Sequence, residues 1–220
     1  MPDPRRNKTE TWVFDLDNTL YPASCRLFDQ IEAQMRSFIR AHLSMDDEAA
    51  SALKRDLFRR HGTTMKGLME EHGVDPHQFL HFVHEIDLSP LDAAPRLDAV
   101  LAALPGRKVI FTNGSRRHAE RVLARLGIDG HFDGIFDIVA AGFTPKPEPA
   151  PYRTMIEALR VDPARATMVE DMARNLKPAA DLGMATVWVP NGNDWGAEGG
   201  GDHVHHVTDD LAAFLAAHGG

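Results

Sequence analysis

The apolar residues of the chain follow two different periodicities, and these divide it into two kinds of structure. Between about residues 27 and 85 they recur every three or four positions, as on one face of a helix. The positions that carry this pattern are Leu27, Ile31, Met35, Phe38, Ile39, Leu53, Leu57 and Phe58. Two shorter helices are predicted at 65–72 and 76–85, the second with Asp75 as N-cap and Pro76 in its first turn.

Short continuous apolar runs on either side of this region predict buried strands. The first, at 12–14, leads into the stretch VFDLDNTLYP (13–22). After about residue 95, such runs alternate with amphipathic segments. The predicted strands are 108–113, 134–141, 166–171 and 185–190, and the predicted helices are 115–127, 151–160 and 172–182. Apolar strands separated by helices predict a parallel sheet covered on both faces, which the first strand is expected to join.

The two regions together predict an α/β fold: a Rossmann-like parallel-sheet core with an inserted all-helical subdomain. The core is expected to comprise residues 1–21 and 91–220, and the insertion residues 22–90. Within the core, the glycine-rich segment 191–202 predicts a flexible surface loop. The segment HVHHVTDD (203–210) predicts an exposed edge strand that leads into a short, capped last helix.

Composition narrows the class of function. Of the 220 residues, 43% are hydrophobic and 25% are charged, which is typical of a globular protein. The formal net charge of −8 disfavours a nucleic-acid polymer as partner, because such binding needs clustered positive charge. It does not exclude a small phosphorylated ligand held by a local site.

Other features bear on where the protein works. No stretch approaches the roughly 18 apolar residues of a membrane span, and the first ten residues lack a signal-peptide pattern. The one cysteine, Cys25, excludes an intrachain disulfide and fits a reducing compartment, where we expect it to pack rather than react. We therefore expect a cytoplasmic protein without a membrane partner, and the sequence leaves its oligomeric state open.

Polar side chains gather where the predicted strands end. Since ligands of open parallel sheets bind at the carboxyl ends of the strands, these side chains are expected to form one site. They are Asp15 and Asp17, then Thr112, Asn113, Gly114 and Ser115, then Lys146, and finally Glu170 and Asp171. Two carboxylates at the end of a buried strand repel each other unless a cation lies close by.

This set of groups predicts a metal-assisted phosphoryl site. Mg²⁺ prefers a few carboxylate oxygens and keeps several of its waters, so Asp15, Asp171 and the backbone carbonyl of Asp17 are expected to share it. The groups expected to hold the phosphate are the hydroxyl of Thr112, the amides of the turn at 113–115 and the ammonium of Lys146.

In order along the chain, these motifs closely resemble those of the haloacid dehalogenase (HAD) superfamily. DLDNTL (15–20) is similar to the first motif, DxDx[TV], and FTNGS (111–115) to the strand that ends in Thr or Ser. Lys146 matches the lysine of the third motif, and VEDMARN (169–175) resembles the acidic fourth motif. The resemblance spans nearly the whole chain, and four motifs in order are far more specific than one.

The resemblance implies catalysis through an aspartyl-phosphate. Asp15 would be the nucleophile, and Asp17 the general acid that protonates the leaving oxygen and then the base that activates water. Dehalogenases of the superfamily lack an acid at the position of Asp17 and use no metal, so Asp17 with the Glu170–Asp171 pair favours a phosphatase. Asp171 is assigned to the metal directly and Glu170 through a metal-bound water.

The helical insertion corresponds to the superfamily's cap, which covers the active site and selects the leaving group. HGTTMKGL (61–68) and the following 72–87 resemble the cap of pyrimidine 5′-nucleotidase-like members, which carry YGTTLxGL. This resemblance implies a pyrimidine nucleoside 5′-monophosphate as substrate. His61 stands where that subgroup has tyrosine, and its imidazole can still stack on a base. Thr63 and Thr64 either contact the substrate or only cap a helix.

Structural interpretations of the same residues stay open. The two aspartates could form an Asx turn, Thr112 with Asn113 could cap the next helix, and Lys146 could be a solvated lysine on a proline-rich loop. The Glu170–Asp171 pair could be an acidic helix start. Four basic residues either form a solvated helix face or attract anions toward the cleft: Lys54, Arg55, Arg59 and Arg60. Three histidines suggest a metal cluster, but we interpret their segment as an edge strand: His203, His205 and His206.

Two other functions also stay open. One is a HAD phosphatase for another small metabolite, such as a sugar phosphate or phosphoglycolate. The other is a non-catalytic phosphate-sensing module on the same fold, against which the complete set of nucleophile, acid/base, lysine and metal ligands counts.

Overall fold

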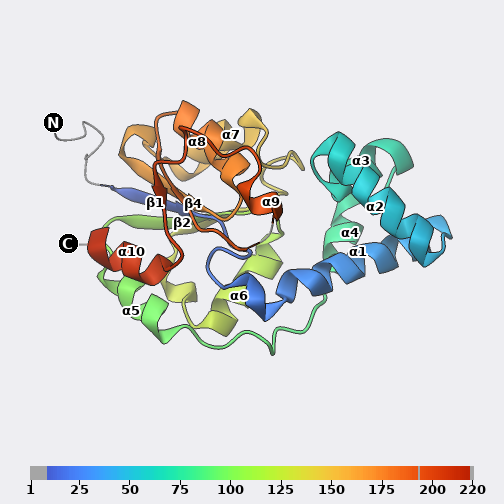
Figure 1. The fold of residues 1–220 in the computed structure, drawn as a ribbon, viewed down its shortest axis with the longest axis horizontal. Coiled ribbons are helices and arrows are strands. Elements are labelled where there is room, and N and C mark those ends of the chain that lie inside the picture. Colours follow the sequence, from blue (N-terminus) through green and yellow to red (C-terminus); the bar gives the residue numbers. More distant parts are fainter. Residues whose placement is uncertain (1–8, 193, 219–220) are drawn as a thin grey trace.

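The computed structural model describes residues 9–192 and 194–218, and Figure 1 shows two parts side by side: a sheet sandwiched between helices, and a group of helices at one end. The sheet of the described residues has six strands in the order β3-β2-β1-β4-β5-β6, and neighbouring strands are parallel. The strands are β1 (Thr11–Phe14), β2 (Arg107–Phe111), β3 (Gly134–Phe136), β4 (Ala166–Glu170), β5 (Ala185–Trp188) and β6 (His206–Val207). The first strand therefore joins the later ones, as predicted.

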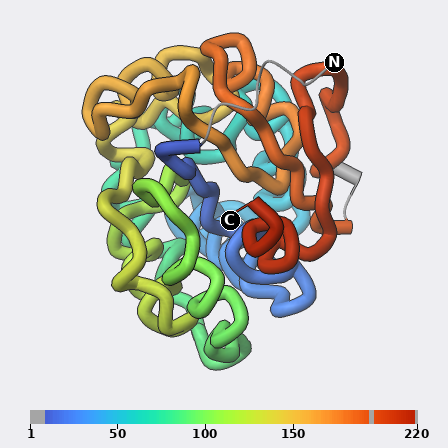
Figure 2. Tube along the Cα trace, turned by 90° about the vertical axis from the view of Figure 1, so that its left-hand side faces the viewer, coloured from blue at the N-terminus to red at the C-terminus, as the bar shows by residue number. Residues whose placement is uncertain are grey.

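Side chains of the central strands alternate between two hydrophobic layers, because successive residues of a strand point to opposite faces. Val13 and Val109 pack with α7 (Pro149–Leu159) and α8 (Ala173–Asp181). Phe14 and Ile110 pack on the other face, with α5 (Pro95–Ala103), α6 (Arg116–Leu126) and α10 (Leu211–His218). Figure 2, which views the core from the end remote from the cap, shows blue β1 between these layers. Burial on both faces explains why these strands are apolar throughout.

The insertion is helical wherever it has regular structure, as predicted. Its helices are α1 (Leu27–Leu43), α2 (Asp47–His61), α3 (Thr64–His72) and α4 (Pro76–Val83). Asp46, Thr63 and Asp75 cap α2, α3 and α4, since each side chain accepts a hydrogen bond from a first-turn amide. Phe38 of α1 meets Phe79 of α4 edge-on, with 5.2 Å between ring centroids. The division into 1–21, 22–90 and 91–220 stays a prediction, and residues 1–8 lie outside the described part of the chain.

One predicted strand boundary was wrong, and one alternative cap that the sequence left open is not formed. The strand expected at 134–141 ends at Phe136, because the carboxylate of Asp137 accepts hydrogen bonds from the amides of Arg116 and Ala140 (both 2.9 Å) and turns the chain. The helix expected at 115–127 is capped by Ser115, whose Oγ accepts from the amide of His118 at 3.3 Å, and not by Thr112 with Asn113.

The segment 191–202 is more structured than predicted. Although residue 193 lies outside the described part, this segment contains the short helix α9 (Asp194–Ala197), and Asn191 reaches into the site described below. The edge strand β6 is exposed and Asp210 caps α10, as expected. Residues 9–192 and 194–218 also contain three single-turn 3₁₀ helices: η1 (Ala23–Cys25), η2 (Asp129–His131) and η3 (Pro163–Arg165). Cys25 is half-buried and packs against the core.

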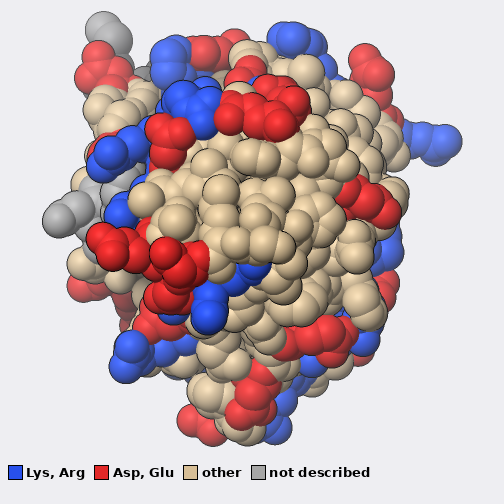
Figure 3. Space-filling model, turned by 90° about the vertical axis from the view of Figure 1, so that its right-hand side faces the viewer, with Lys and Arg blue, Asp and Glu red and all other residues tan. Residues whose placement is uncertain are grey.

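Two surface properties bear on possible partners. Among residues 9–192 and 194–218, no helix is both long and apolar enough to cross a membrane. On the face at the cap end, basic and acidic side chains intermix around a broad uncharged area (Figure 3). Among the residues drawn in colour there, positive charge does not gather into the strip that a nucleic-acid backbone would need.

Candidate active site

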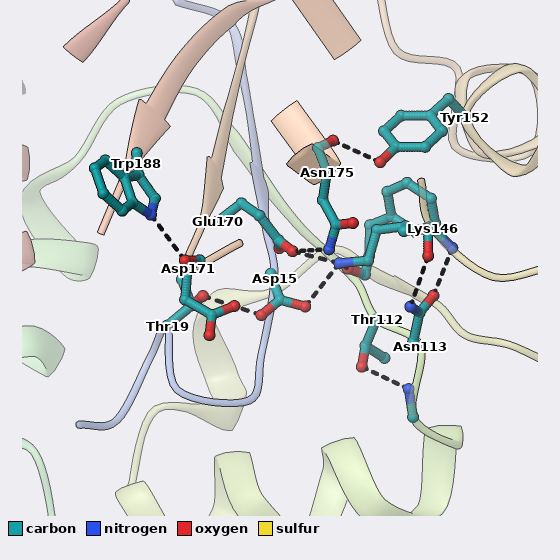
Figure 4. A network of polar contacts seen from close by, with 12 residues as sticks. Asp15, Thr19, Thr112, Asn113, Lys146, Tyr152, Glu170, Asp171, Asn175 and Trp188 are labelled. Atoms are coloured by element: carbon teal, nitrogen blue, oxygen red, sulfur yellow. Dashed lines mark hydrogen bonds and ion pairs between the residues drawn. The ribbon is translucent and has the colours of Figure 1, made fainter. Parts of the chain in front are cut away.

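Three carboxylates and one lysine form a buried cluster at the carboxyl ends of the central strands (Figure 4). Asp15 follows β1, Glu170 ends β4 and Asp171 follows it; β1 and β4 are neighbours, with Phe14 beside Val169. One oxygen from each carboxylate lies within 4.8 Å of the others. The Nζ of Lys146 donates to Asp15 Oδ1 at 2.7 Å and to Glu170 Oε2 at 3.1 Å. Residues 131 positions apart thus meet in a direct ion pair.

The charges of this cluster do not balance. Burial raises the pKa of Asp15, which the ammonium of Lys146 counteracts. Burial and the charge of Asp15 raise the pKa of Asp171 to about 8, and burial with the same neighbour raises the pKa of Glu170 well above its usual range. Burial alone would lower the pKa of Lys146. The negative charges of Asp15 and Glu170 outweigh this effect and raise the pKa above its usual value, so the lysine stays charged. Three carboxylates carry more negative charge than one ammonium can neutralise. The cluster therefore binds either protons or a further cation.

A hard divalent cation fits this donor set. Oxygens from Asp15, Glu170 and Asp171 are close enough to serve one ion, and only carboxylates contribute to this cluster of potential ligands among the described residues. Neighbouring side chains orient them. Thr19 Oγ1 donates to Asp15 Oδ2 (3.0 Å), Asn175 donates to Glu170, and Asn191 Nδ2 donates to Asp171 Oδ2 (2.6 Å). Such bonds fix the direction of ligand oxygens in metal sites.

The loop that carries Lys146 is held by Asn113. Asn113 Oδ1 accepts from the amide of Lys146 at 2.8 Å, and its Nδ2 donates to the Lys146 carbonyl at 3.3 Å. The side chain of Asn113 is therefore committed to the loop, and a phosphate would meet its backbone instead. Thr112 Oγ1 accepts from the amide of Gly114 at 2.9 Å, and a Cβ at Gly114 would lie 3.2 Å from this oxygen and 3.6 Å from Asp17 Oδ2.

Asp17 is anchored through one of its two oxygens. Its Oδ1 accepts from His118 Nε2 at 2.7 Å and from Tyr21 Oη at 2.6 Å. Burial favours the neutral acid, but His118 and Tyr21 together lower the pKa of Asp17 to about 2. Asp17 is therefore a carboxylate in the ligand-free protein, with Oδ2 on the side of Gly114.

These groups form the floor of a cavity of about 660 Å³ between the core and the cap. The floor includes Asp15, Asp17, Thr112 and Lys146. The cap contributes an apolar and a basic part of the wall: Phe28, Met35, Phe58, Phe79 and Leu80, and Arg36, Lys54, Arg55 and Arg59. The volume is typical of sites for ligands larger than phosphate alone.

The family model of haloacid dehalogenase-like hydrolases matches residues 9–183. The chain belongs to this family of hydrolases. Phosphate metabolism protein 8 of Saccharomyces cerevisiae is 29% identical over 204 residues, which cover 84% of this chain and 62% of that protein. Phosphoglycolate phosphatase of Psychrobacter arcticus is 23% identical, over 92% of this chain and 93% of that protein. The structure of a HAD phosphatase from Thermococcus onnurineus has a TM-score of 0.64 at 20% identity, covering 96% of this chain and 99% of that one.

The structure brings together most of the residues that the HAD motifs predict for the core: Asp15, Asp17, Thr112, Asn113, Gly114, Lys146, Glu170 and Asp171 line the cavity. Ser115 does not line it, because its Oγ caps α6 and contacts His84. Their individual roles stay predictions. The histidines at 203, 205 and 206 lie elsewhere. His203 Nε2 lies 3.0 Å from the Ala173 carbonyl and His205 Nδ1 accepts from Thr186, so both serve the packing of the edge.

The cap residues are arranged differently from the prediction. His61 is not among the residues that line the cavity, because its ring nitrogens face Glu70 (2.9 Å) and Glu71 (2.5 Å) of α3. That it stacks on a base stays a prediction, which this arrangement of His61 does not support. Thr63 and Thr64 do line the cavity, although Thr63 also caps α3 and Thr64 donates to the Lys54 carbonyl (3.4 Å).

The basic residues of α2 divide into two groups. Lys54, Arg55 and Arg59 line the cavity, whereas Arg60 forms ion pairs with Asp56 and Glu71 away from it. The hypothesis that this helix attracts anions toward the cleft therefore stays open for three of its four cations.

Sequence reasoning missed several residues that contact the predicted ones: Thr19, Tyr21, His84, His118, Asn175 and Asn191. Two signals were available. Thr19 follows Asp15 by four residues, Tyr21 follows Asp17 by four residues, and Asn175 closes the fourth motif. His84 and His118 are 34 positions apart and meet only because α4 ends against α6, which no local pattern reveals.

Proposed function

We propose that the protein is a Mg²⁺-dependent phosphomonoesterase that acts through an aspartyl-phosphate. The observation that carries this proposal is the arrangement at the cavity floor. Asp15 is ion-paired with buried Lys146, and the side chain of Asp17 provides a second carboxylate that has its own hydrogen-bond partners. The relatives named as phosphatases support the same reaction class. A non-catalytic phosphate sensor would have no need for this second carboxylate.

In the proposed first step, an oxygen of Asp15 forms a bond to phosphorus while the bond between phosphorus and the ester oxygen breaks. Asp17, which takes up a proton when the anionic substrate binds beside it, gives this proton to the leaving oxygen. In the second step, Asp17 takes a proton from water, the water oxygen bonds to phosphorus, and the bond between phosphorus and Asp15 breaks. The first step releases an alcohol and the second releases inorganic phosphate, and the two together regenerate the enzyme.

The surrounding groups have separate tasks in this scheme. Lys146 neutralises negative charge at the nucleophile, and Thr112 with the backbone of Asn113 and Gly114 binds the phosphate oxygens. Asp15, Asp171 and the Asp17 carbonyl would hold Mg²⁺, with Glu170 acting through a water. The bound ion would supply charge neutralisation between the carboxylates and the anionic phosphate.

We further propose a pyrimidine nucleoside 5′-monophosphate as substrate and the cytoplasm as location. The large cavity and the aromatic rings of Phe28, Phe58 and Phe79 in the cap wall favour a planar leaving group. A smaller metabolite, such as a sugar phosphate or phosphoglycolate, is the second candidate, favoured by the basic part of the wall and by the relative from Psychrobacter arcticus.

The test is a panel of phosphate esters assayed with and without Mg²⁺: uridine and cytidine monophosphates, sugar phosphates, phosphoglycolate and p-nitrophenyl phosphate. We expect Mg²⁺-dependent release that is fastest from the two nucleotides and lost in Asp15→Asn. The matched control is Asp98→Asn, which removes a surface carboxylate paired with His131 and should keep full activity. No release from any ester would overturn the proposal, and release from sugar phosphates alone would overturn only the nucleotide assignment.

A further inference from the structure

Two buried histidines stand next to Asp17 and have no task in the mechanism above. His118 lies in the first turn of α6, is 0% exposed, and contacts Asp17 through Nε2. His84 ends α4, where the cap returns to the core, and is 7% exposed. The two rings are stacked, with centroids 4.4 Å apart and planes 12° from parallel.

The hydrogen bonds define which nitrogen of His118 carries a proton. Since the carboxylate of Asp17 can only accept, Nε2 must be the donor. The Nδ1 of His118 is buried and has no hydrogen-bond partner among the described residues. The ring is thus held by one hydrogen bond and by the stack, and not by the two hydrogen bonds usual for a buried histidine in a core.

His84 is itself fixed from two sides. Its Nδ1 lies 2.9 Å from Ser115 Oγ, and its carbonyl accepts from Arg121 at 2.7 Å. Arg121 also donates to the carbonyl of Ile86 at 3.1 Å, so α6 holds the returning segment in place. Burial and the neighbouring His118 lower the pKa of His84 to about 3, so the ring in the stack is neutral.

The contacts act on a single oxygen of Asp17. His118 and Tyr21 both donate to Oδ1, and these two bonds restrict rotation about the last side-chain bond. Oδ2 is left directed toward Gly114, in the lining of the cavity where the leaving oxygen must come. Proton transfer needs such alignment, because small displacements at the reacting atoms are costly in rate.

We infer that His118, held in place by the stacked His84, is a positioning residue that directs Asp17 Oδ2 at the leaving oxygen of the substrate. The inference rests on the proposed function, in which Asp17 is the general acid. A merely packed histidine would also be buried and bonded, but its loss would disturb all substrates alike.

Leaving-group dependence separates the two interpretations. The leaving oxygen of an alkyl phosphate needs protonation. The leaving group of p-nitrophenyl phosphate is a stabilised anion, so its departure needs little protonation. The quantity to compare is kcat/KM, because it reports the transfer to Asp15 and excludes the hydrolysis that both esters share.

The experiment compares His118→Leu, which removes the donor, with His118→Gln, whose amide nitrogen can replace Nε2. For the alkyl phosphate that the wild type hydrolyses fastest, we expect kcat/KM of His118→Leu to fall by about 30- to 100-fold, a part of what general acid catalysis contributes. For p-nitrophenyl phosphate the fall should be about 3-fold or less, and His118→Gln should recover most of the loss. The control His131→Gln alters a similar His–Asp pair, 2.6 Å long, outside the site and should leave both values unchanged.

Equal losses for both esters in folded His118→Leu, or no recovery in His118→Gln, would overturn the inference and leave the proposed function intact. A wild type that hydrolyses neither ester would overturn both. If His118→Leu does not fold, His118→Asn takes its place, since its shorter amide does not reach Asp17; it should show the same difference between the esters. A His118→Asn variant that treats both esters alike would again contradict the inference.

Discussion

On the core side of the cavity, charged groups are bonded to one another; on the cap side, several are not. Asp15, Lys146 and Glu170 form one ion-paired unit, with neighbouring side chains on the remaining oxygens. In the cap wall, the guanidinium groups of Arg36, Arg55 and Arg59 have no hydrogen-bond or ion-pair partner among the described residues. A closed network suits groups whose positions must not change during catalysis, whereas unpaired cations suit a wall whose partner arrives with the substrate.

The largest effect should come from breaking the ion-paired network on the core side of the cavity. Lys146→Met leaves the buried carboxylates without their ammonium, so we expect about 10²–10³-fold lower activity. In Mg²⁺-free buffer we also expect about 3–5 kcal/mol lower free energy of unfolding, as for other broken buried pairs. Urea titration and steady-state assays measure both.

The matched control is Lys108→Met. Lys108 lies near the start of β2, beside Trp12 of β1, whereas the carboxylates follow or end their strands. Its Nζ donates to the Gly106 carbonyl at 3.1 Å, and its loss should leave activity unchanged. If Lys146→Met were as stable and as active as this control, the ion pairs of Lys146 would contribute neither to stability nor to activity.

Mg²⁺ should stabilise the floor in a pH-dependent way. In the metal-free protein the pKa of Asp171 is raised from 3.8 to about 8, so between these values the folded state binds more protons than the unfolded one. Stability therefore falls as pH rises through this window. Because Mg²⁺ replaces those protons, its gain in Tm should be larger at about pH 8 than at about pH 6.

Thermal denaturation with and without Mg²⁺ at the two pH values measures this gain, and Asp171→Asn should abolish most of it. A gain in Tm that is the same at both values, or that persists unchanged in Asp171→Asn, would contradict the assignment of Asp171 as a ligand.

Smaller effects are expected on the cap side. Arg55→Gln and Arg59→Gln should change the ratio of kcat/KM between substrates of different leaving group by about 3- to 10-fold, while kcat for p-nitrophenyl phosphate stays the same. Arg60→Gln is the control, because Arg60 is paired with Asp56 and Glu71 outside the cavity. Equal ratios in all three variants would mean that the unpaired arginines are only a solvated face.

The smallest effect should follow His61→Tyr, which restores the aromatic residue of the nucleotidase-like caps. Since His61 faces Glu70 and Glu71 and does not line the cavity, we expect about 2-fold or less change in the preference between nucleotides and sugar phosphates. A large shift toward nucleotides, measured on the same panel, would show that residue 61 reaches the substrate after all.

The same division explains what could be predicted from the sequence. The fold and the meeting of Asp15, Lys146 and Asp171 followed from apolar strands and from the rule that strand ends share one edge. The cap contacts did not, because they depend on how helices pack. His61 lies at the end of α2, and its contact with the acids of α3 depends on how these two helices pack.

The polar partners of the predicted residues could not be predicted from the sequence either. Asn113 was expected at the phosphate, but its side chain holds the Lys146 loop, and the choice depends on a contact across 33 residues. His84 and His118 carry no motif of their own that reasoning from a single sequence can interpret. Their stack depends on the packing of the end of α4 against α6.

The central claim is that Asp15 attacks phosphorus, and trapping the phosphorylated enzyme tests it most directly. Asp17→Asn slows the second step, and p-nitrophenyl phosphate keeps the first step fast because its leaving group needs little protonation. Rapid acid quench followed by peptide mass spectrometry should find one phosphoryl group on the peptide that contains Asp15, together with a burst of one equivalent of nitrophenolate. A phosphoryl group on any other residue, or phosphate release that persists in Asp15→Asn, would contradict the account.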